Sequence, residues 1–349
     1  MKPTGEQANI GAPVELDSIE RDLKKLWADG NGALTRASLI NLAVYSEEPG
    51  SLAGNTQLIS RIMENHACRV LVIETNPLAA SDHAQAWINA HCHVRAGAKQ
   101  ICSEQLSFKL DGTKLLTSVL FSHLDSDLPL YLWWQAELRS PLDPQLWTWV
   151  DRLIFDSREW PDFTSQLQLV YAAQREAAPR EMVLCDLNWT RVLHFRYAFA
   201  QFFDDPVSRR CLHEIEQLTV VCGDGYRSTA LLFVGWIAAQ LEWNVVGETA
   251  PLAFLNQSRR RVEVRISEEG SAPLASLRAR TRDVEFNVRR AECGDLLEVA
   301  GAATGVQSEH QLLPGGDCDL ASLVSEELMR GGVRVVYRRA VEKIQRFLR

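Results

Sequence analysis

The segment VVCGDGYRSTALL (220–232) holds the side chains with the clearest chemical potential in this chain. An apolar run ends at Cys222, a glycine-containing turn follows, and Arg227 and Ser228 precede a long apolar stretch that predicts a helix. Backbone N–H groups and the dipole at a helix N-terminus stabilise a thiolate or a bound anion. Cys222 and Arg227 are therefore a candidate nucleophile and its anion-binding partner.

An ordinary turn explains the same residues. Four residues separate Cys222 from Arg227, a spacing that resembles the active loop of rhodanese-type sulfurtransferases and differs from the five-residue spacing of protein tyrosine phosphatases. A rhodanese domain places most of its strands before this loop, whereas here a long β-rich segment follows it. Gly223 and Gly225 also suit a tight turn, with Cys222 as a small buried group at the end of a strand. Because the motif is so short, the structural interpretation is favoured.

A second group of side chains, His91-Cys92-His93 with His66 and Cys68 upstream, could bind a metal ion. His91 and His93 would point to the same face of a strand. A structural zinc site takes four ligands, commonly in paired Cys-x-x-Cys or Cys-x-x-His spacings, and neither spacing occurs here. We therefore expect no metal site and interpret these histidines as part of a strand edge.

Arginines alternate with apolar residues in two segments, RRRVEVR (259–265) and LASLRARTRDVEFNVRR (274–290). On a strand, this alternation places side chains such as Arg265 and Arg280 away from the core. The pattern fits either a solvated sheet face or a positive surface that docks an anionic partner. Both interpretations stay open.

Trp133 and Trp134 end the apolar strand LPLYLWW (128–134) and point to opposite faces of it. One is expected in the core and the other at the crevice or the surface, where open α/β sheets bind ligands. No Ser/His/Asp order, Walker loop, Rossmann glycine fingerprint or HExxH motif occurs in the chain. This lack of a catalytic signature favours a binding or regulatory protein without a cofactor over an enzyme.

The composition is that of an acidic globular protein, with 349 residues, a formal charge of −8 and 46% hydrophobic residues. This charge argues against nucleic-acid binding by the molecule as a whole. The N-terminal segment lacks the apolar core of a signal peptide, and the longest apolar run (230–239) is too short to cross a bilayer. Eight widely spaced cysteines do not form a secreted disulfide framework. We expect a cytoplasmic protein, away from membranes, whose thiols are mostly reduced.

Strands and helices alternate through the first part of the chain. An amphipathic helix is expected at 16–27, and two β-rich runs around 91–97 and 100–110 predict a hairpin through Ala96-Gly97. The expected buried strands include 37–46, 69–75 and 128–134. This alternation predicts an α/β domain whose mostly parallel sheet is covered by helices.

After residue 206 the pattern changes. One more β–α unit (218–241) precedes several strand-like segments and a basic amphipathic C-terminal helix (334–348). These segments predict a second, α+β domain with an antiparallel sheet. We divide the chain into an N-terminal helical arm (1–30), an α/β domain (31–206) and an α+β domain (207–349).

Six sequence blocks occur in an order that resembles the OpcA family, the glucose-6-phosphate dehydrogenase assembly proteins of bacteria. They are HACRVLVIE (66–74), QICSEQLSF (100–108), DLPLYLWW (127–134), DRLIFDS (151–157), DLNWTRV (186–192) and YRSTALLFVGWIAAQL (226–241). The resemblance spans roughly residues 36 to 330. Members often carry a second cysteine where this chain has Ser103 after Cys102.

The resemblance implies a non-catalytic partner of glucose-6-phosphate dehydrogenase in the oxidative pentose phosphate pathway. Family members favour the active oligomer of that enzyme and raise its apparent affinity for substrate. Such an allosteric activator has only to bind the active state better than the inactive one. The residues we expect to contact the partner are Trp133, Trp134, Arg191, Arg265 and Arg280.

The resemblance also implies redox control, because the family is linked to thioredoxin in photosynthetic bacteria, which makes thioredoxin a further implied partner. Cys293 and Cys318 are the candidate redox pair, provided that their Cα atoms lie within about 7 Å. Two alternative functions stay open. One is a rhodanese-like sulfurtransferase centred on Cys222 and Arg227, and the other is a sugar-phosphate-binding module that uses the strand ends and the arginines.

Overall fold

The computed structural model describes residues 10–28, 34–94, 100–204, 206–247, 252–292, 294–303, 309–331 and 335–348. The chain forms two compact units, each with its own β-sheet. The first unit comprises Met1–Phe155, Gln166–Cys185 and Leu320–Gly332, and the second comprises Asp156–Ser165, Asp186–Asp319 and Val333–Arg349. The chain therefore passes between the two units several times.

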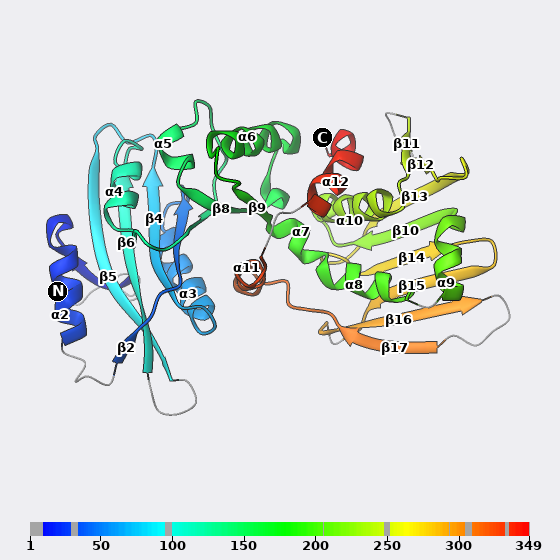
Figure 1. Cartoon of the computed structure of the whole chain (residues 1–349), viewed down its shortest axis with the longest axis horizontal. Helices are drawn as coiled ribbons and strands as arrows, with labels where there is room; N and C mark the ends of the chain where they lie inside the picture. Colours follow the sequence, from blue (N-terminus) through cyan, green and yellow to red (C-terminus); the bar gives the residue numbers. More distant parts are fainter. Residues whose placement is uncertain are drawn as a thin grey trace. The chain divides into compact units, whose positions relative to one another are not determined.

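The described strands of the first unit make one nine-stranded sheet (Figure 1). They are β1 (Ala12–Val14), β2 (Leu34–Arg36), β3 (Ile40–Ser46), β4 (Cys68–Asn76), β5 (His83–Val94), β6 (Gln100–Asp111), β7 (Leu130–Trp134), β8 (Val150–Phe155) and β9 (Val183–Asp186). The order is β1-β5-β6-β4-β3-β7-β8-β9, with β2 paired to β6. Strands β6, β4, β3, β7 and β8 are parallel neighbours, whereas β5 is antiparallel to β6 and to β1. From β6 to β9 this is the 3-2-1-4-5-6 order of a doubly wound sheet.

Continuous apolar runs explain why the central strands are buried on both faces. All residues of β4 from Cys68 to Thr75 are buried, as expected for a strand with helices on both sides. The helices of this unit are α2 (Ile19–Ala28), α3 (Ser51–Met63), α4 (Leu116–Ser122), α5 (Pro144–Trp147), most of α6 (Phe163–Glu176) and α11 (Leu320–Met329). Helix α3 packs on β4 and β6, and α11 packs on α3.

Buried charges anchor helix α2 to this sheet. Arg69 on β4 pairs with Glu104 on β6 at 2.9 Å and with Glu20 on α2 at 2.7 Å. Trp27, near the end of α2, donates its indole N–H to Glu104 at 2.6 Å. Arg69 and Glu104 are almost fully buried, so loss of either would leave an uncompensated charge in the core. The amphipathic helix expected at 16–27 therefore packs as part of the first unit.

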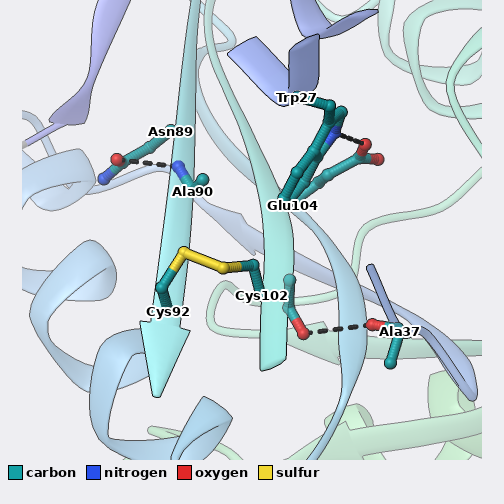
Figure 2. Close-up of a disulfide and its surroundings, with 8 residues drawn as sticks. Trp27, Ala37, Asn89, Ala90, Cys92, Cys102 and Glu104 are labelled. Carbon is teal, nitrogen blue, oxygen red and sulfur yellow. Dashed lines mark hydrogen bonds between the residues drawn. A yellow bond between two sulfur atoms is a disulfide. The ribbon is translucent and has the colours of Figure 1, made fainter. Parts of the chain in front are cut away.

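The predicted hairpin is confirmed, since β5 and β6 pair in antiparallel register on either side of residues 95–99. Cys92 lies directly opposite Cys102, and the two sulfur atoms form a disulfide (Figure 2). The carbonyl of Cys102 accepts the N–H of Ala37 at 3.2 Å, which ties the segment after β2 to the same strand. The expectation of mostly reduced thiols has to be corrected for this pair, because the hairpin register holds the two side chains together.

The second unit contains an eight-stranded sheet of described strands. They are β10 (Gln217–Cys222), β11 (Asn244–Val246), β12 (Ala253–Leu255), β13 (Arg261–Glu268), β14 (Ser276–Arg280), β15 (Val284–Arg290), β16 (Leu296–Ala303) and β17 (Glu309–Pro314). The order is β11-β12-β13-β10-β14-β15-β16-β17. Strands β10 and β13 are parallel, and the other neighbours are antiparallel.

An aromatic core joins one face of this sheet to its helices. The helices are α7 (Leu187–Arg191), α8 (Leu193–Gln201), α9 (Pro206–Cys211), α10 (Arg227–Gln240) and α12 (Val335–Ile344). Phe199 on α8 contacts Phe233 on α10 edge to face, and Phe203 contacts Phe286 on β15. Helices α10 and α12 pack closely at Gly235. A side chain at this position would lie only 2.5 Å from the carbonyl oxygen of Ala340, so the contact requires glycine.

The fold class expected from the sequence is confirmed: a mostly parallel sheet with helices, and a second α+β part with a mostly antiparallel sheet. The main crossing into the second unit falls after Cys185, whereas the sequence places a boundary at 206. It falls earlier because α7 and α8 pack against α10 and the second sheet. Among the described residues, every helix is too short or too polar to span a bilayer.

Candidate functional site

Doubly wound sheets bind ligands at the carboxyl edge where the strand order reverses. In the first sheet this position lies between β3 and β7. Trp134 ends β7 there and stacks on Tyr45 of β3, with ring centroids 3.9 Å apart. The hydroxyl of Tyr45 donates to Glu47 at 2.9 Å, and Arg139 pairs with Glu47 at 2.6 Å. Stacked aromatic rings and a closed ion pair thus occupy this edge of the sheet.

The N-terminus of α3, which follows β3, is capped by the chain itself. Glu74, at the end of β4, is 4% exposed and accepts the backbone N–H of Leu52 at 3.2 Å. In doubly wound sheets that bind dinucleotides, this helix N-terminus holds the pyrophosphate. Here the carboxylate of Glu74 takes that position, and Lys109 lies 3.5 Å from its other oxygen. The sequence also lacks the glycine fingerprint with which such sheets bind a pyrophosphate.

The β10–α10 loop places Cys222 where the sequence predicts it, at the end of a strand before a helix. The thiol is buried and donates to the carbonyl of Ser267 at 3.6 Å. Burial, reinforced by the nearby charge of Glu268, raises the pKa of Cys222 to about 11. Arg227 is half-exposed and lies 4.0 Å from Glu268. A thiol with this pKa is protonated at neutral pH, which argues against the nucleophile interpretation.

Close backbone packing accounts for the first glycine in that loop. A side chain at Gly223 would lie 2.6 Å from the backbone carbonyl carbon of Ser271. Gly223 also donates its N–H to the carbonyl of Ala272 at 2.7 Å. The turn is therefore built for contact between two backbone segments of the second unit, which is the structural interpretation given by the sequence.

The DLNWTR block forms a buried polar cluster beneath α10. Asp186 accepts hydrogen bonds from the N–H and hydroxyl of Ser157, from the N–H of Asn188 and from the hydroxyl of Tyr337. Burial raises the pKa of Asp186 to about 6. Because Tyr337 lies on α12, the cluster fixes α7 and the C-terminal helix to each other within the second unit.

Arg191 belongs to this cluster and not to the surface. Its guanidinium is buried and binds both carboxylate oxygens of Asp156, at 2.7 and 2.5 Å. Trp133, with 2% of its surface exposed, lies in the core of the first unit. Burial therefore argues against Arg191 and Trp133 as contacts for a partner. Trp134 remains partly accessible, and its partner-binding role stays a prediction.

Arg265 and Arg280 do lie together, on the outer face of the second sheet. Val262 and Val264 point inward and are buried, whereas Arg261, Glu263 and Arg265 alternate with them and are exposed. On β14 the exposed residues are Arg278 and Arg280. Strand β10 lies between β13 and β14, so the arginines of both neighbours flank it. The alternation seen in the sequence correctly predicts that these arginines point away from the core.

The cysteine and histidine candidates give a mixed result. Cys293 lies outside the described residues, so its pairing with Cys318 stays a prediction. Burial raises the pKa of the Cys318 thiol, against the opposing effect of Arg290. His91 contacts Gln105, and its neighbour Cys92 is in the disulfide. In the described part of the chain no three His, Cys, Asp or Glu side chains are grouped as metal ligands.

Sequence reasoning missed two features that a stricter reading of register could have found. In a hairpin centred on residue 97, positions 92 and 102 are opposite each other, and both are cysteines. An acidic residue at the end of the second parallel strand, Glu74, was also available as a cap for the helix after the first. The hydrogen bond from Tyr337 to Asp186 spans 151 residues and has no local signal.

Two family models match the chain. One, described as the glucose-6-phosphate dehydrogenase subunit N-terminal domain, matches residues 59–172, and the corresponding C-terminal domain matches residues 182–341. Together they cover most of the chain, with the first sheet matched from β4 onward.

Curated relatives agree with these models. A protein of Nostoc punctiforme, provisionally named OxPP cycle protein OpcA, is 24% identical over 312 residues, which is 81% of this chain and 65% of the relative. A protein of Synechocystis with the same name is 24% identical over 94% of this chain and 72% of its own length. The chain thus spans about two thirds of the relatives that it matches.

A solved structure, an aldose-aldose oxidoreductase from Caulobacter crescentus, aligns with a TM-score of 0.48 and 9% identity over 88% of this chain and 94% of that one. Likeness at this level says nothing about activity. The matches to both domain models show that the chain belongs to the OpcA family of glucose-6-phosphate dehydrogenase assembly proteins.

Proposed function

We propose that this protein is a non-catalytic subunit that binds glucose-6-phosphate dehydrogenase and favours the active oligomer of that enzyme. Family membership supports an association with the dehydrogenase. The observation that carries the non-catalytic part is the carboxylate of Glu74 at the N-terminus of α3. A doubly wound sheet would bind a nicotinamide dinucleotide at that position, and here the chain's own side chain takes it.

The other candidate chemistries lack comparable support. The buried Cys222 thiol, with its raised pKa, does not suit sulfur transfer. The loop before α3 does not suit a sugar phosphate, since Glu74 already occupies the N-terminus of that helix. A binding function requires none of these groups, because selective affinity for one state of the dehydrogenase is sufficient.

The expected effect follows from linkage. If the protein binds the active oligomer more tightly than the inactive form by about 1 to 3 kcal/mol, the equilibrium between them shifts about 5- to 150-fold. The dehydrogenase in turn gains apparent affinity for glucose 6-phosphate by the same coupling, because substrate and subunit favour the same state. Action in the cytoplasmic oxidative pentose phosphate pathway and control by thioredoxin are part of this proposal.

A titration tests the proposal. The purified protein is added to the dehydrogenase at subsaturating glucose 6-phosphate, and activity and oligomer size are followed in the same samples. We expect activity and the larger species to rise together and to saturate at a fixed molar ratio. Activity and size that stay constant over the whole titration would rule the proposal out.

A further inference from the structure

We infer that the open face of the second sheet is the surface that docks on the dehydrogenase, and that it receives an acidic segment of that enzyme. This inference rests on the proposed function and adds the place and the chemistry of contact. The open face is defined here as the outward-pointing residues of five neighbouring strands, β13, β10, β14, β15 and β16. They are Arg261, Glu263 and Arg265 on β13; Gln217, Thr219 and Val221 on β10; Ser276, Arg278 and Arg280 on β14; Glu285, Asn287 and Arg289 on β15; and Glu298 on β16.

The open face has a strip of short, uncharged side chains between two rows of arginines. On β10 the outward residues are Gln217, Thr219 and Val221, all partly exposed. Thr219 lies opposite Arg265 on one side and Arg278 on the other. The two arginines are therefore two strand spacings apart, about 10 Å between their backbones. A strip of this width between longer cationic side chains suits an extended acidic segment.

One face of the parallel pair β10 and β13 is buried within the chain, and the other face is partly exposed. Parallel strands are normally covered on both faces, whereas antiparallel strands commonly leave one face in water. Here β10 is parallel to β13 and antiparallel to β14, and its inner side chains Leu218 and Val220 are fully buried. Its outer side chains remain partly exposed in the chain by itself. A second molecule would complete the cover that a parallel pair usually has.

The charges of the open face favour an acidic partner. The open face carries five arginines and three glutamates and is therefore positively charged, whereas the whole chain has a formal charge of −8. Each glutamate pairs with one arginine: Glu263 with Arg265, Glu285 with Arg278, and Glu298 with Arg289. Among the described residues, Arg261 and Arg280 have no carboxylate partner within 4.0 Å.

Two of the three pairs on this face, those of Arg265 and Arg278, are weak enough to exchange partners, whereas Arg289 binds Glu298 at 2.5 Å. Arg265 and Arg278 have more than 60% of their side-chain surface exposed, and their ion pairs are 3.6 and 3.4 Å long. Exposed pairs of this kind contribute little to stability. The arginines can therefore turn toward carboxylates of a docked enzyme, where exclusion of water strengthens each pair.

Charge reversal tests the open face directly. In the double variant Arg265→Glu, Arg280→Glu, we expect the Kd for the dehydrogenase to rise at least tenfold at low salt, with a smaller rise at high salt because salt screens the pairs. The matched control is the double variant Arg175→Glu, Arg346→Glu, which reverses two exposed arginines outside the open face and should bind like the wild type. Thermal unfolding shows whether each variant keeps the stability of the wild type.

A second variant keeps the test independent of charge. Thr219→Trp places a bulky residue that strands tolerate in the middle of the strip, and it should weaken binding with little effect on folding. If the wild type binds and both open-face variants bind equally well, the inference is wrong while the proposed function stands. If the wild type does not bind at all, the proposed function itself fails. A dimer of this chain that the double variant dissociates would assign the open face to self-association and overturn the inference.

Discussion

The Cys92–Cys102 disulfide should stabilise the first unit measurably, and its removal gives a prediction with a defined size. The cross-link closes a loop of about 10 residues between strands β5 and β6. The loss of chain entropy in the unfolded state then corresponds to about 2.7 kcal/mol at 25 °C. We expect Cys92→Ser to lower the free energy of unfolding of the first unit by about this amount.

The structure limits what else the variant can change. The strands stay paired over the rest of their register, and the buried pair between Arg69 and Glu104 still anchors α2. Urea unfolding with hydrogen exchange of the β5 and β6 amides as the readout reports on this hairpin alone. With a slope near 2.5 kcal/mol per molar, the midpoint should fall by about 1 M. Reductant should lower the midpoint of the wild type by the same amount and leave the midpoint of Cys92→Ser unchanged. Cys211→Ser, which removes a thiol outside the disulfide, serves as the cysteine control.

Two observations would refute this reasoning. The denatured, unreduced protein should show two fewer reactive thiols than the reduced protein, and equal counts would mean that the disulfide is absent in solution. If the counts differ but the midpoint is unchanged on reduction, the hairpin would already be ordered in the unfolded chain, and the entropic argument would fail.

Three further predictions follow from buried groups. Cys222→Ser should leave activation of the dehydrogenase intact, and the wild type should show no thiosulfate:cyanide sulfur transfer; turnover that disappears with this change would restore the nucleophile interpretation. Burial raises the pKa of Asp186 from 3.8 to about 6, so the folded state binds this proton more tightly, and stability present below about pH 3.8 is lost as the pH rises through about 6. Asp186→Asn should flatten that decline by up to about 3 kcal/mol, which unfolding measured across pH 4 to 7 will show, and an unchanged slope would mean that Asp186 is ionised throughout. Glu74→Ala should destabilise α3 by about 1 kcal/mol through loss of its cap. This variant should still bind no nicotinamide dinucleotide in a fluorescence titration, because the stacked rings of Tyr45 and Trp134 still occupy this edge of the sheet; tight binding would show that Glu74 alone blocks the site.

Local patterns were sufficient to predict the elements but not the way they assemble. The apolar run in β4 and the alternation in β13 identified a buried strand and an open sheet face, since each depends on side chains a few residues apart. The 3-2-1-4-5-6 strand order depends on contacts between distant segments, and these contacts cannot be inferred from any one segment of the sequence. Arg191 was expected on the surface because its partner, Asp156, lies 35 residues earlier in the chain.

The segment WTRVLHFRYAFAQFFD (189–204), whose apolar spacing predicts a single helix, shows the same limit on a smaller scale. The structure divides this segment at Val192 into α7 and α8. The division lets Asn188 bond to Ser228 at the start of α10 while Phe199 reaches the aromatic core. Helical periodicity continues across the break, so the sequence gives no sign of it.

The most direct measurement is the titration of this protein into glucose-6-phosphate dehydrogenase at subsaturating substrate, with mass photometry on the same samples. A non-catalytic subunit should raise the rate and the fraction of the larger oligomer along one shared, saturable curve, with the double variant Arg265→Glu, Arg280→Glu displaced to higher concentration. A rate and a size distribution that ignore the added protein, in both oxidised and reduced samples, would contradict binding as its mode of action.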